Sequence, residues 1–157
     1  MAKLETPWFL DAVFYQVYPQ SFMDSGGDGV GDINGLTRKL DYLQGLGVDA
    51  VWLNPVFESP FNDAGYDVSD YLKIARRYGT ISDFKRLVRE ARARRIRVVL
   101  DFVPNHTSDE HPWFLASKRH KRNAFSNWYV WNKRALDGKW ILNVNGRTDM
   151  YYSMFHP

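Results

Sequence analysis

The chain has 157 residues, a formal net charge of +3 and no cysteine, which excludes a disulfide framework and a thiolate metal site. No apolar run reaches the roughly eighteen residues of a membrane span, and the first residues lack the apolar stretch of a signal peptide. We therefore expect a cytoplasmic protein without a membrane partner. The six Trp, nine Tyr and ten Phe suit a large core, and also a groove that stacks on flat ligands such as sugars.

The first predicted element is a strand over residues 13–18, which ends at Pro19 because proline cannot donate a ladder hydrogen bond. A loop rich in glycine and aspartate follows over residues 24–32. A helix comes next, with Asn34 as its predicted N-cap and Gly47 at its C-terminal end. The apolar residues of this helix recur at helical spacing and are Leu36, Leu40, Leu43 and Leu46.

A second strand is predicted over residues 48–53, and a long loop over residues 56–80 leads to a second helix capped by Ser82. The inward stripe of that helix is Phe84, Leu87, Val88 and Ala91. Basic residues crowd positions 85–97, and we interpret them as a solvated helix face rather than a nucleic-acid patch, because acidic residues lie among them. The third strand covers residues 96–103, whose near-continuous apolar run is typical of a strand buried on both faces.

Alternating strands and helices predict a parallel sheet with right-handed crossovers. Three strands and two helices are not a self-contained architecture, whereas a (β/α)₈ barrel takes about 250 residues. If the fold is such a barrel, residues 1–104 supply less than half of it. Residues 105–157 lose the pattern and are interpreted as an irregular insertion, in which residues 140–142 and 150–152 form a hairpin around Asn145-Gly146.

The loop over residues 24–32 carries a carboxylate at every fourth position, in the manner of the oxygen ligands of an EF-hand loop. The candidate ligands for a structural Ca²⁺ or Mg²⁺ are Asp24, Asp28, Asp32 and the Val30 carbonyl. Gly26 and Gly35 stand where an EF-hand has two further side-chain ligands. The alternative is therefore a glycine-rich turn whose aspartates form local hydrogen bonds.

Polar residues also follow the second and third strands. Asp63 and Tyr66 lie in the loop after the second strand, and His106 follows the third. The carboxyl ends of neighbouring parallel strands meet at one rim, where α/β proteins bind ligands. A carboxylate and an imidazole bind hydroxyls, and an aromatic face stacks on C–H groups, so the three residues predict a sugar site. The alternative is that each of them only shapes a turn or fills the core.

Glycoside hydrolysis needs two carboxyl groups that flank the scissile bond. Asp101 lies within the third strand, and we interpret it as structural, because a buried carboxylate needs a partner. The other acids available to pair with Asp63 are Glu58, Asp67, Asp70, Asp109 and Glu110. The sequence places none of them at another strand end, so no catalytic pair is assigned within the chain.

Residues 101–114 resemble the first diagnostic region of the α-amylase family, glycoside hydrolase family 13. The resemblance extends over residues 8–22, 24–32, 52–60 and 65–71. The branch that matches best contains α-glucosidases and oligo-1,6-glucosidases, with trehalose synthases near by.

This resemblance implies an α/β fold, the first three βα units of a (β/α)₈ TIM barrel, with a domain B inserted over residues 105–157 after the third strand. It implies that Asp63, Tyr66 and His106 hold the non-reducing glucose of an oligosaccharide substrate. It also implies that the loop over residues 24–32 binds Ca²⁺ or Mg²⁺. The family mechanism is retaining and passes through a covalent glucosyl-enzyme.

In the family, the catalytic carboxylates follow the fourth, fifth and seventh strands, and no residue up to Pro157 matches them. We therefore expect the amino-terminal portion of an α-glucosidase that acts on short α-linked oligosaccharides, inactive by itself and prone to aggregate. Two alternatives stay open. One is a trehalose synthase, and the other is a non-catalytic domain like those of amino-acid-transporter heavy chains.

Overall fold

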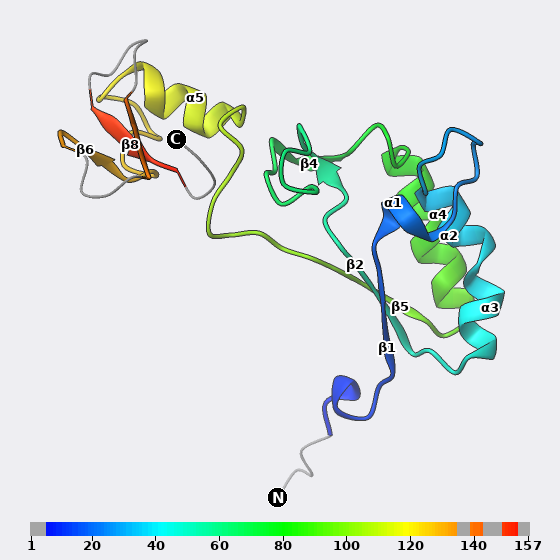
Figure 1. Cartoon of the computed structure of the whole chain (residues 1–157). Coiled ribbons are helices and arrows are strands. Elements are labelled where there is room, and N and C mark those ends of the chain that lie inside the picture. Colours follow the sequence, from blue (N-terminus) through cyan, green and yellow to red (C-terminus); the bar gives the residue numbers. More distant parts are fainter. Residues whose placement is uncertain (1–5, 135–138, 143–148, 154–157) are drawn as a thin grey trace, which may run out of the picture. The chain divides into compact units, whose positions relative to one another are not determined.

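The computed structural model describes residues 6–134, 139–142 and 149–153. Two compact units divide the chain. The first unit comprises Met1–Glu58 and Leu72–Phe102, and the second comprises Ser59–Tyr71 and Val103–Pro157 (Figure 1). The second unit thus takes in a loop that follows the second predicted strand as well as the predicted insertion. The division into a barrel part and an inserted domain at residue 104 stays a prediction.

The first unit is built on a three-stranded parallel sheet in the order β1-β2-β5. Its strands are β1 (Phe14–Val17), β2 (Ala50–Leu53) and β5 (Arg97–Leu100), so the three predicted strands are confirmed. The third strand ends at Leu100, three residues earlier than predicted. Its ladder closes with the Asp101 N–H, which donates to the Leu53 carbonyl at 3.0 Å, and β2 itself ends at Leu53.

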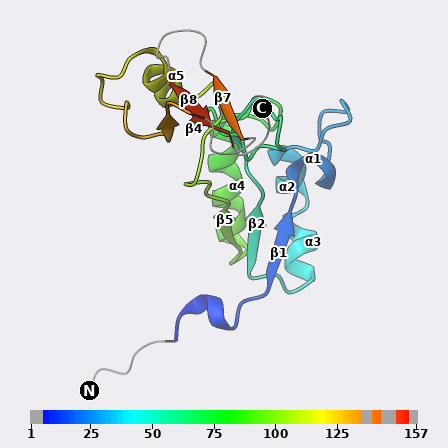
Figure 2. The same cartoon turned by 60° about the vertical axis from the view of Figure 1, so that its left-hand side comes forward.

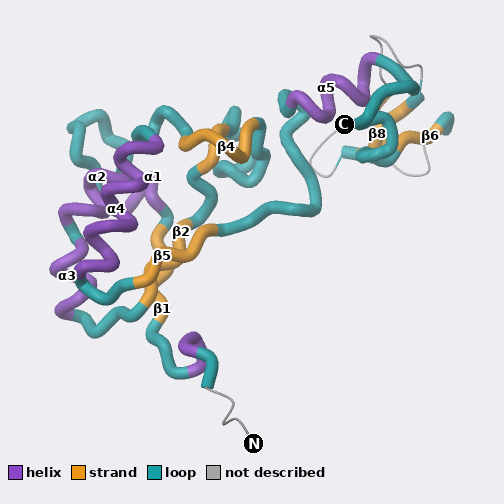
Figure 3. The backbone as a smooth tube through the Cα atoms, turned by 180° about the vertical axis from the view of Figure 1, so that it is seen from behind, coloured by secondary structure: helices purple, strands orange, loops and turns teal. Residues whose placement is uncertain are grey.

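Helices of the first unit lie on one face of this sheet, as the opposite views of Figures 1 and 3 show. They are α2 (Ile33–Arg38), α3 (Leu40–Gly45) and α4 (Ile81–Ala93). Two short elements precede them, the 3-10 helix η1 (Trp8–Leu10) and α1 (Pro19–Phe22). Among the residues described, no helix is long and apolar enough to cross a membrane.

The first predicted helix is interrupted, because Lys39 leaves helical geometry (φ −97°, ψ 3°) between α2 and α3. Its predicted N-cap was wrong. Asp32, not Asn34, caps α2 by accepting a hydrogen bond from the Gly35 N–H at 2.7 Å. Gly47 follows the end of α3 with φ +78°, the left-handed conformation that glycine adopts without strain.

The cap of α4 is likewise two residues earlier than predicted, at Thr80 instead of Ser82. The Thr80 hydroxyl accepts from the Asp83 N–H, and the Asp83 carboxylate accepts from the Thr80 N–H at 2.9 Å, so a capping box starts the helix. Leu87 and Ala91 are buried as predicted, whereas Val88 is exposed.

The core of the first unit lies between the sheet and these helices. The largest fully buried side chains of the first unit are Val17, Ile33, Leu36, Leu40, Leu43, Val51, Leu53, Pro55, Val56, Tyr78 and Leu87. Burial raises the pKa of Tyr78 to about 12, which keeps its phenol neutral. Leu46 completes the predicted stripe but is half exposed, because it follows the last turn of α3.

The opposite face of the sheet is partly open. Phe14 and Trp52 point to that face from neighbouring strands and are 41% and 39% exposed. Trp8 covers the end of this face at which β1 and β5 begin. The Trp8 ring packs 5.7 Å from the Phe14 ring and 4.4 Å from the Arg97 guanidinium. Within the described ladders, β1 and β5 are both edge strands.

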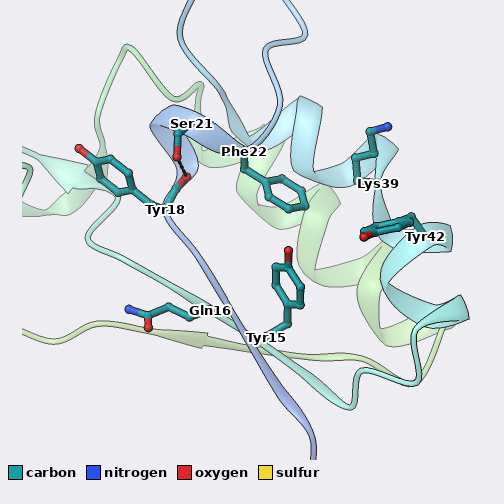
Figure 4. A pocket seen from close by; sticks show the side chains of 7 residues that line it. All are labelled: Tyr15, Gln16, Tyr18, Ser21, Phe22, Lys39 and Tyr42. Atoms are coloured by element: carbon teal, nitrogen blue, oxygen red, sulfur yellow. Dashed lines mark hydrogen bonds between the residues drawn. The ribbon is translucent and has the colours of Figure 1, made fainter.

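A groove of about 520 Å³ opens beside β1, toward α1 and α3. Figure 4 shows the rings of Tyr15, Phe22 and Tyr42 gathered in this groove, with Lys39 at its margin. The Tyr15 and Phe22 rings meet edge to face at 6.1 Å.

The long loop predicted over residues 56–80 contains two strands that the prediction missed. They are β3 (Phe57–Glu58) and β4 (Asp70–Ile74), which pair as a two-stranded sheet. The Ala75 N–H extends the pairing to the Val56 carbonyl at 2.8 Å. β3 has only two residues and carries no periodicity, which is why the apolar pattern alone did not reveal it.

The second unit is more regular than predicted. It holds a helix that the sequence interpretation missed, α5 (Pro112–Arg119), and an antiparallel sheet in the order β6-β8-β7. Its strands are β6 (Trp131–Asn132), β7 (Trp140–Leu142) and β8 (Met150–Tyr152). Figure 2 shows β7 beside β8, so the predicted hairpin is confirmed, while its turn at Asn145-Gly146 lies outside the described residues.

Aromatic packing holds this unit together. The buried Phe114 ring of α5 lies 5.1 Å from the Tyr129 ring, 5.0 Å from Tyr151 and 5.9 Å from Trp131. Such contacts bury large areas and prefer edge-to-face and offset geometries. The aromatic share of the composition therefore supplies a core for the second unit.

Candidate functional site

A cavity of about 660 Å³ opens within the second unit. Its lining combines polar groups with aromatic rings, a composition that suits a hydroxyl-rich ligand with apolar C–H faces. The polar side chains include Asn62, Asp63, Asp67, Asn105, His106 and Asp109, and the rings include Trp113, Phe114, Trp128, Tyr129 and Tyr151.

Asp67 organises the loop that forms one wall of this cavity. Its side chain is buried, with 5% of the residue exposed. One carboxylate oxygen accepts from the Ser59 hydroxyl at 2.8 Å and from the Asp63 N–H at 3.2 Å, and the other accepts from the Asn62 N–H at 2.8 Å. Ser59 also accepts from the Phe61 N–H at 2.9 Å. The loop is therefore folded around one carboxylate.

A tight turn over residues 63–66 follows from these bonds. The Tyr66 N–H donates to the Asp63 carbonyl at 2.8 Å, and both central residues have positive φ, 53° at Ala64 and 98° at Gly65. Glycine adopts this region freely, whereas alanine rarely does. The turn thus holds Ala64 in a conformation that its own preference opposes.

His106 is linked to the same turn. Its Nε2 lies 3.2 Å from the Tyr66 carbonyl oxygen, and its Nδ1 lies 3.3 Å from the Asn105 amide nitrogen. Because a carbonyl only accepts and an amide nitrogen only donates, the bonds fit a neutral imidazole that carries its proton on Nε2. A sugar hydroxyl that bonds Nδ1 would take the place of the Asn105 amide.

The Tyr71 hydroxyl bonds to the main chain at and before His106. Its hydroxyl donates to the Val103 carbonyl at 2.5 Å and lies 3.2 Å from the His106 carbonyl. Burial, reinforced by nearby Tyr129, raises the pKa of the Tyr71 phenol. The ring stacks 6.0 Å from that of Trp113, which joins the polar wall of the cavity to its aromatic wall.

Of the three predicted sugar-binding residues, Asp63 and His106 line the cavity together. Tyr66 is half-buried and joins them through its main-chain oxygen. Their role in binding a sugar stays a prediction. The sequence interpretation considered Asp67 only as a possible catalytic acid and missed its place as the acceptor of the loop. Two of its donors are main-chain N–H groups, which every sequence has, so the residue types gave no signal of this place.

Asp101 lies in the first unit and is half-buried just beyond the end of β5. Its carboxylate accepts a hydrogen bond from the Trp52 indole N–H at 2.9 Å. The strand therefore ends before Asp101 instead of enclosing it. A tryptophan partner on the neighbouring strand agrees with the structural role inferred from the sequence.

The acidic residues of the loop over residues 24–32 bond to its own main chain. Asp24 accepts from the N–H groups of Gly26, Gly27 and Gly29 at 2.6–2.8 Å, and Asp28 accepts from the Val30 N–H at 2.9 Å. Hydrogen bonds from Gly29 and Gly27 lower the pKa of the Asp24 carboxyl.

Asp32 caps α2, and it also accepts from the Ser25 N–H at 2.9 Å. Partial burial opposes ionisation of Asp32, but hydrogen bonds from Gly35 and Ser25 outweigh it and lower its pKa. In the described part of the chain, no three acidic or histidine side chains converge as a metal site requires. The carboxylates as placed fit the shaped turn, and the predicted cation stays a prediction.

The chain is similar to proteins of one known family. The model of the α-amylase catalytic domain matches residues 16–153. The chain belongs to the α-amylase family, glycoside hydrolase family 13. The (β/α)₈ barrel of that family explains the parallel sheet of the first unit, whose strands correspond to the first units of the barrel.

Several relatives are similar in sequence and structure. The chain is 55% identical to a palatinase from Erwinia rhapontici over 85% of its own length and 24% of that protein. It is 53% identical to an oligo-1,6-glucosidase from Parageobacillus thermoglucosidasius over 82% of its length and 23% of that enzyme. The trehalulose synthase from Pseudomonas mesoacidophila superposes with a TM-score of 0.88 at 44% identity, over 94% of this chain and 29% of that one. The chain thus spans about a quarter of the length of these α-amylase-family relatives.

Proposed function

We propose that the chain is the amino-terminal part of a retaining α-glucosidase-type glycoside hydrolase that acts on short α-glucosidic oligosaccharides. The observation that carries the proposal is the shared cavity of Asp63 and His106, in a chain about half identical to a palatinase and an oligo-1,6-glucosidase. In this proposal the two side chains hold hydroxyls of the terminal glucose, and Tyr66 presents its ring to the same sugar.

The chemistry of these groups fits that task. The Asp63 carboxylate accepts hydrogen bonds from sugar hydroxyls, and charge-assisted bonds of this kind are about twice as strong as neutral ones. His106 can accept a further hydroxyl proton at Nδ1 once the Asn105 amide moves aside. The bond-breaking acid and nucleophile are proposed to lie outside these 157 residues, in the rest of the enzyme.

The test is the activity of the full-length protein that carries this chain. We expect it to release glucose from isomaltose or maltose, with the α-anomer appearing first in a proton NMR time course, because retention requires two inversions. We expect Asp63→Asn to lower kcat/KM by about tenfold or more, because a charged hydrogen bond to substrate is lost. Asp11→Asn, the same charge change on an exposed residue of the first unit, is the matched control.

Two results would contradict the proposal. Trehalose accumulating from maltose without net glucose release would establish the trehalose synthase alternative. Absence of any turnover of α-glucosides by the full-length protein would favour a non-catalytic member of the family. The 157-residue chain alone is expected to turn over neither isomaltose nor maltose, because no carboxylate pair is assigned within it.

A further inference from the structure

We propose that Asp67 is a positioning residue for the glucose site, which holds Asp63 and His106 in place through the turn over residues 63–66. The inference rests on the proposed function. Asp67 itself takes no part in bond breaking, since its carboxylate is buried and both of its oxygens accept hydrogen bonds from the loop.

Three hydrogen-bond donors surround the Asp67 carboxylate. The Ser59 hydroxyl and the main-chain N–H groups of Asn62 and Asp63 all point at its two oxygens, at 2.8–3.2 Å. A carboxylate offers acceptors on both oxygens, whereas an amide replaces one of them by a donor. An asparagine at this position would therefore set an N–H₂ group against at least one N–H or O–H, and leave that buried group without its bond.

Two residues of this loop have a strained backbone conformation. Phe61 and Ala64 both have left-handed φ angles, 61° and 53°. Non-glycine residues persist in this region only when surrounding bonds hold them there. The two N–H groups bound by Asp67 belong to Asn62 and Asp63, the residues between these two strained positions. The carboxylate is thus placed to hold the loop against the preference of both residues.

Hydrogen bonds connect the turn over residues 63–66 to the His106 imidazole. The Asp63 main chain is bonded on one side to Asp67 and on the other to the Tyr66 N–H, at 2.8 Å. The carbonyl of Tyr66 in turn meets His106 Nε2 at 3.2 Å. Relaxation of the turn would move the Asp63 carboxylate and the acceptor that orients His106 at the same time. A displacement of about 1 Å in a binding group is enough to reduce activity greatly.

The experiment compares Asp67→Asn, Ser59→Ala and the Asp11→Asn control in the full-length enzyme. Kinetics with isomaltose are combined with inhibition by 1-deoxynojirimycin, a glucose-shaped imino sugar that probes the glucose site without turnover. We expect Asp67→Asn to raise both KM and the inhibition constant by about tenfold or more, the effect of a lost charged hydrogen bond. Ser59→Ala keeps both main-chain donors on Asp67 but removes the hydroxyl that donates to its carboxylate and accepts from the Phe61 N–H, so a smaller rise of about two- to threefold is expected.

The pattern separates positioning from mere stability. A purely structural role would lower the active fraction, and hence the apparent kcat, while KM and the inhibition constant stayed at wild-type values; that result would overturn the proposal. If Asp67→Asn does not fold, Ser59→Ala decides, and unchanged constants in that variant reject the inference. If the unsubstituted enzyme neither hydrolyses α-glucosides nor binds the imino sugar, the proposed function fails first and the inference falls with it.

Discussion

We expect His111 to make the stability of the second unit depend on pH. The residue is 4% exposed, and its Nδ1 accepts the Trp113 N–H at 3.1 Å to cap α5. Burial lowers the pKa of His111, and the nearby Asp70 carboxylate partly opposes this shift. A proton on Nδ1 would turn the acceptor into a donor and break the cap.

The sign of the effect follows from proton linkage. Because the pKa is lowered in the folded state, the unfolded chain binds the proton more readily below about pH 6.5, the ordinary value for histidine. The free energy of unfolding therefore has its full value above about pH 6.5, and it falls as the pH drops through the lowered pKa of folded His111. We expect urea denaturation between pH 7 and pH 5 to show this loss. His111→Asn, which keeps a capping acceptor but does not titrate there, should flatten the profile; an unchanged slope in that variant would assign the pH response elsewhere.

Single residues of the candidate site were only partly predictable from the sequence. The sequence predicted that Asp63 and His106 lie close together, and they line one cavity, while their binding of a sugar stays a prediction. Asp67 was missed as a loop centre, since its three donors lie up to eight positions away and two of them are main-chain groups. Main-chain donors are the same for every sequence, so residue types gave no signal of the convergence.

Among the elements, the loop over residues 24–32 allows a direct test of two interpretations. Asp32 caps α2 through Gly35, so Asp32→Ala should cost about 1 kcal/mol of stability whether or not a cation is present. Thermal unfolding in EDTA and in millimolar Ca²⁺ measures this. A loss of stability seen only in Ca²⁺ would instead establish the predicted cation site. Asp28→Ala serves as the comparison, because the Asp28 carboxylate accepts from the Val30 N–H two residues further on and caps no helix.

The exact ends of the helices and strands were less predictable than the elements themselves. The strands were found from apolar runs, but the helix caps were placed two residues late, because Asn34 and Ser82 are as suitable by type as Asp32 and Thr80. The missing information was three-dimensional, namely which side chain reaches the free N–H groups. The helix α5 was overlooked because its eight residues are dominated by aromatic packing, which hides a helical period.

For the chain as a whole, the open sheet face of the first unit predicts self-association. Phe14 lies on the edge strand β1 and is 41% exposed, and the exposed Trp52 lies on the same face of the neighbouring strand β2. Free strand edges and apolar faces pair with other chains unless a charge blocks them. We expect the 157-residue chain to grow in mass with concentration in sedimentation experiments, and Phe14→Lys to reduce this growth.

Leu72→Lys is the control for charge alone, because Leu72 is 89% exposed but stands on β4, outside the three-stranded sheet. Equal suppression by both variants would show that added charge, and not the sheet edge, governs association. A chain that stays monomeric at all concentrations would contradict the prediction outright.

The bonds that tie residues 59–71 to the segment after β5 have a consequence for the order of folding. Tyr71 reaches the carbonyls of Val103 and His106, and the Ser108 N–H reaches the Val68 carbonyl at 2.8 Å, across sequence separations of 32 to 40 residues. Closing so long a loop carries an entropic cost before any contact repays it. On a ribosome, the β1–β2 pair and its helices are synthesised well before the cavity wall can close. The cavity of the second unit is thus among the late-forming parts of this chain, because its strained turn bonds to His106, which is synthesised forty residues after Tyr66.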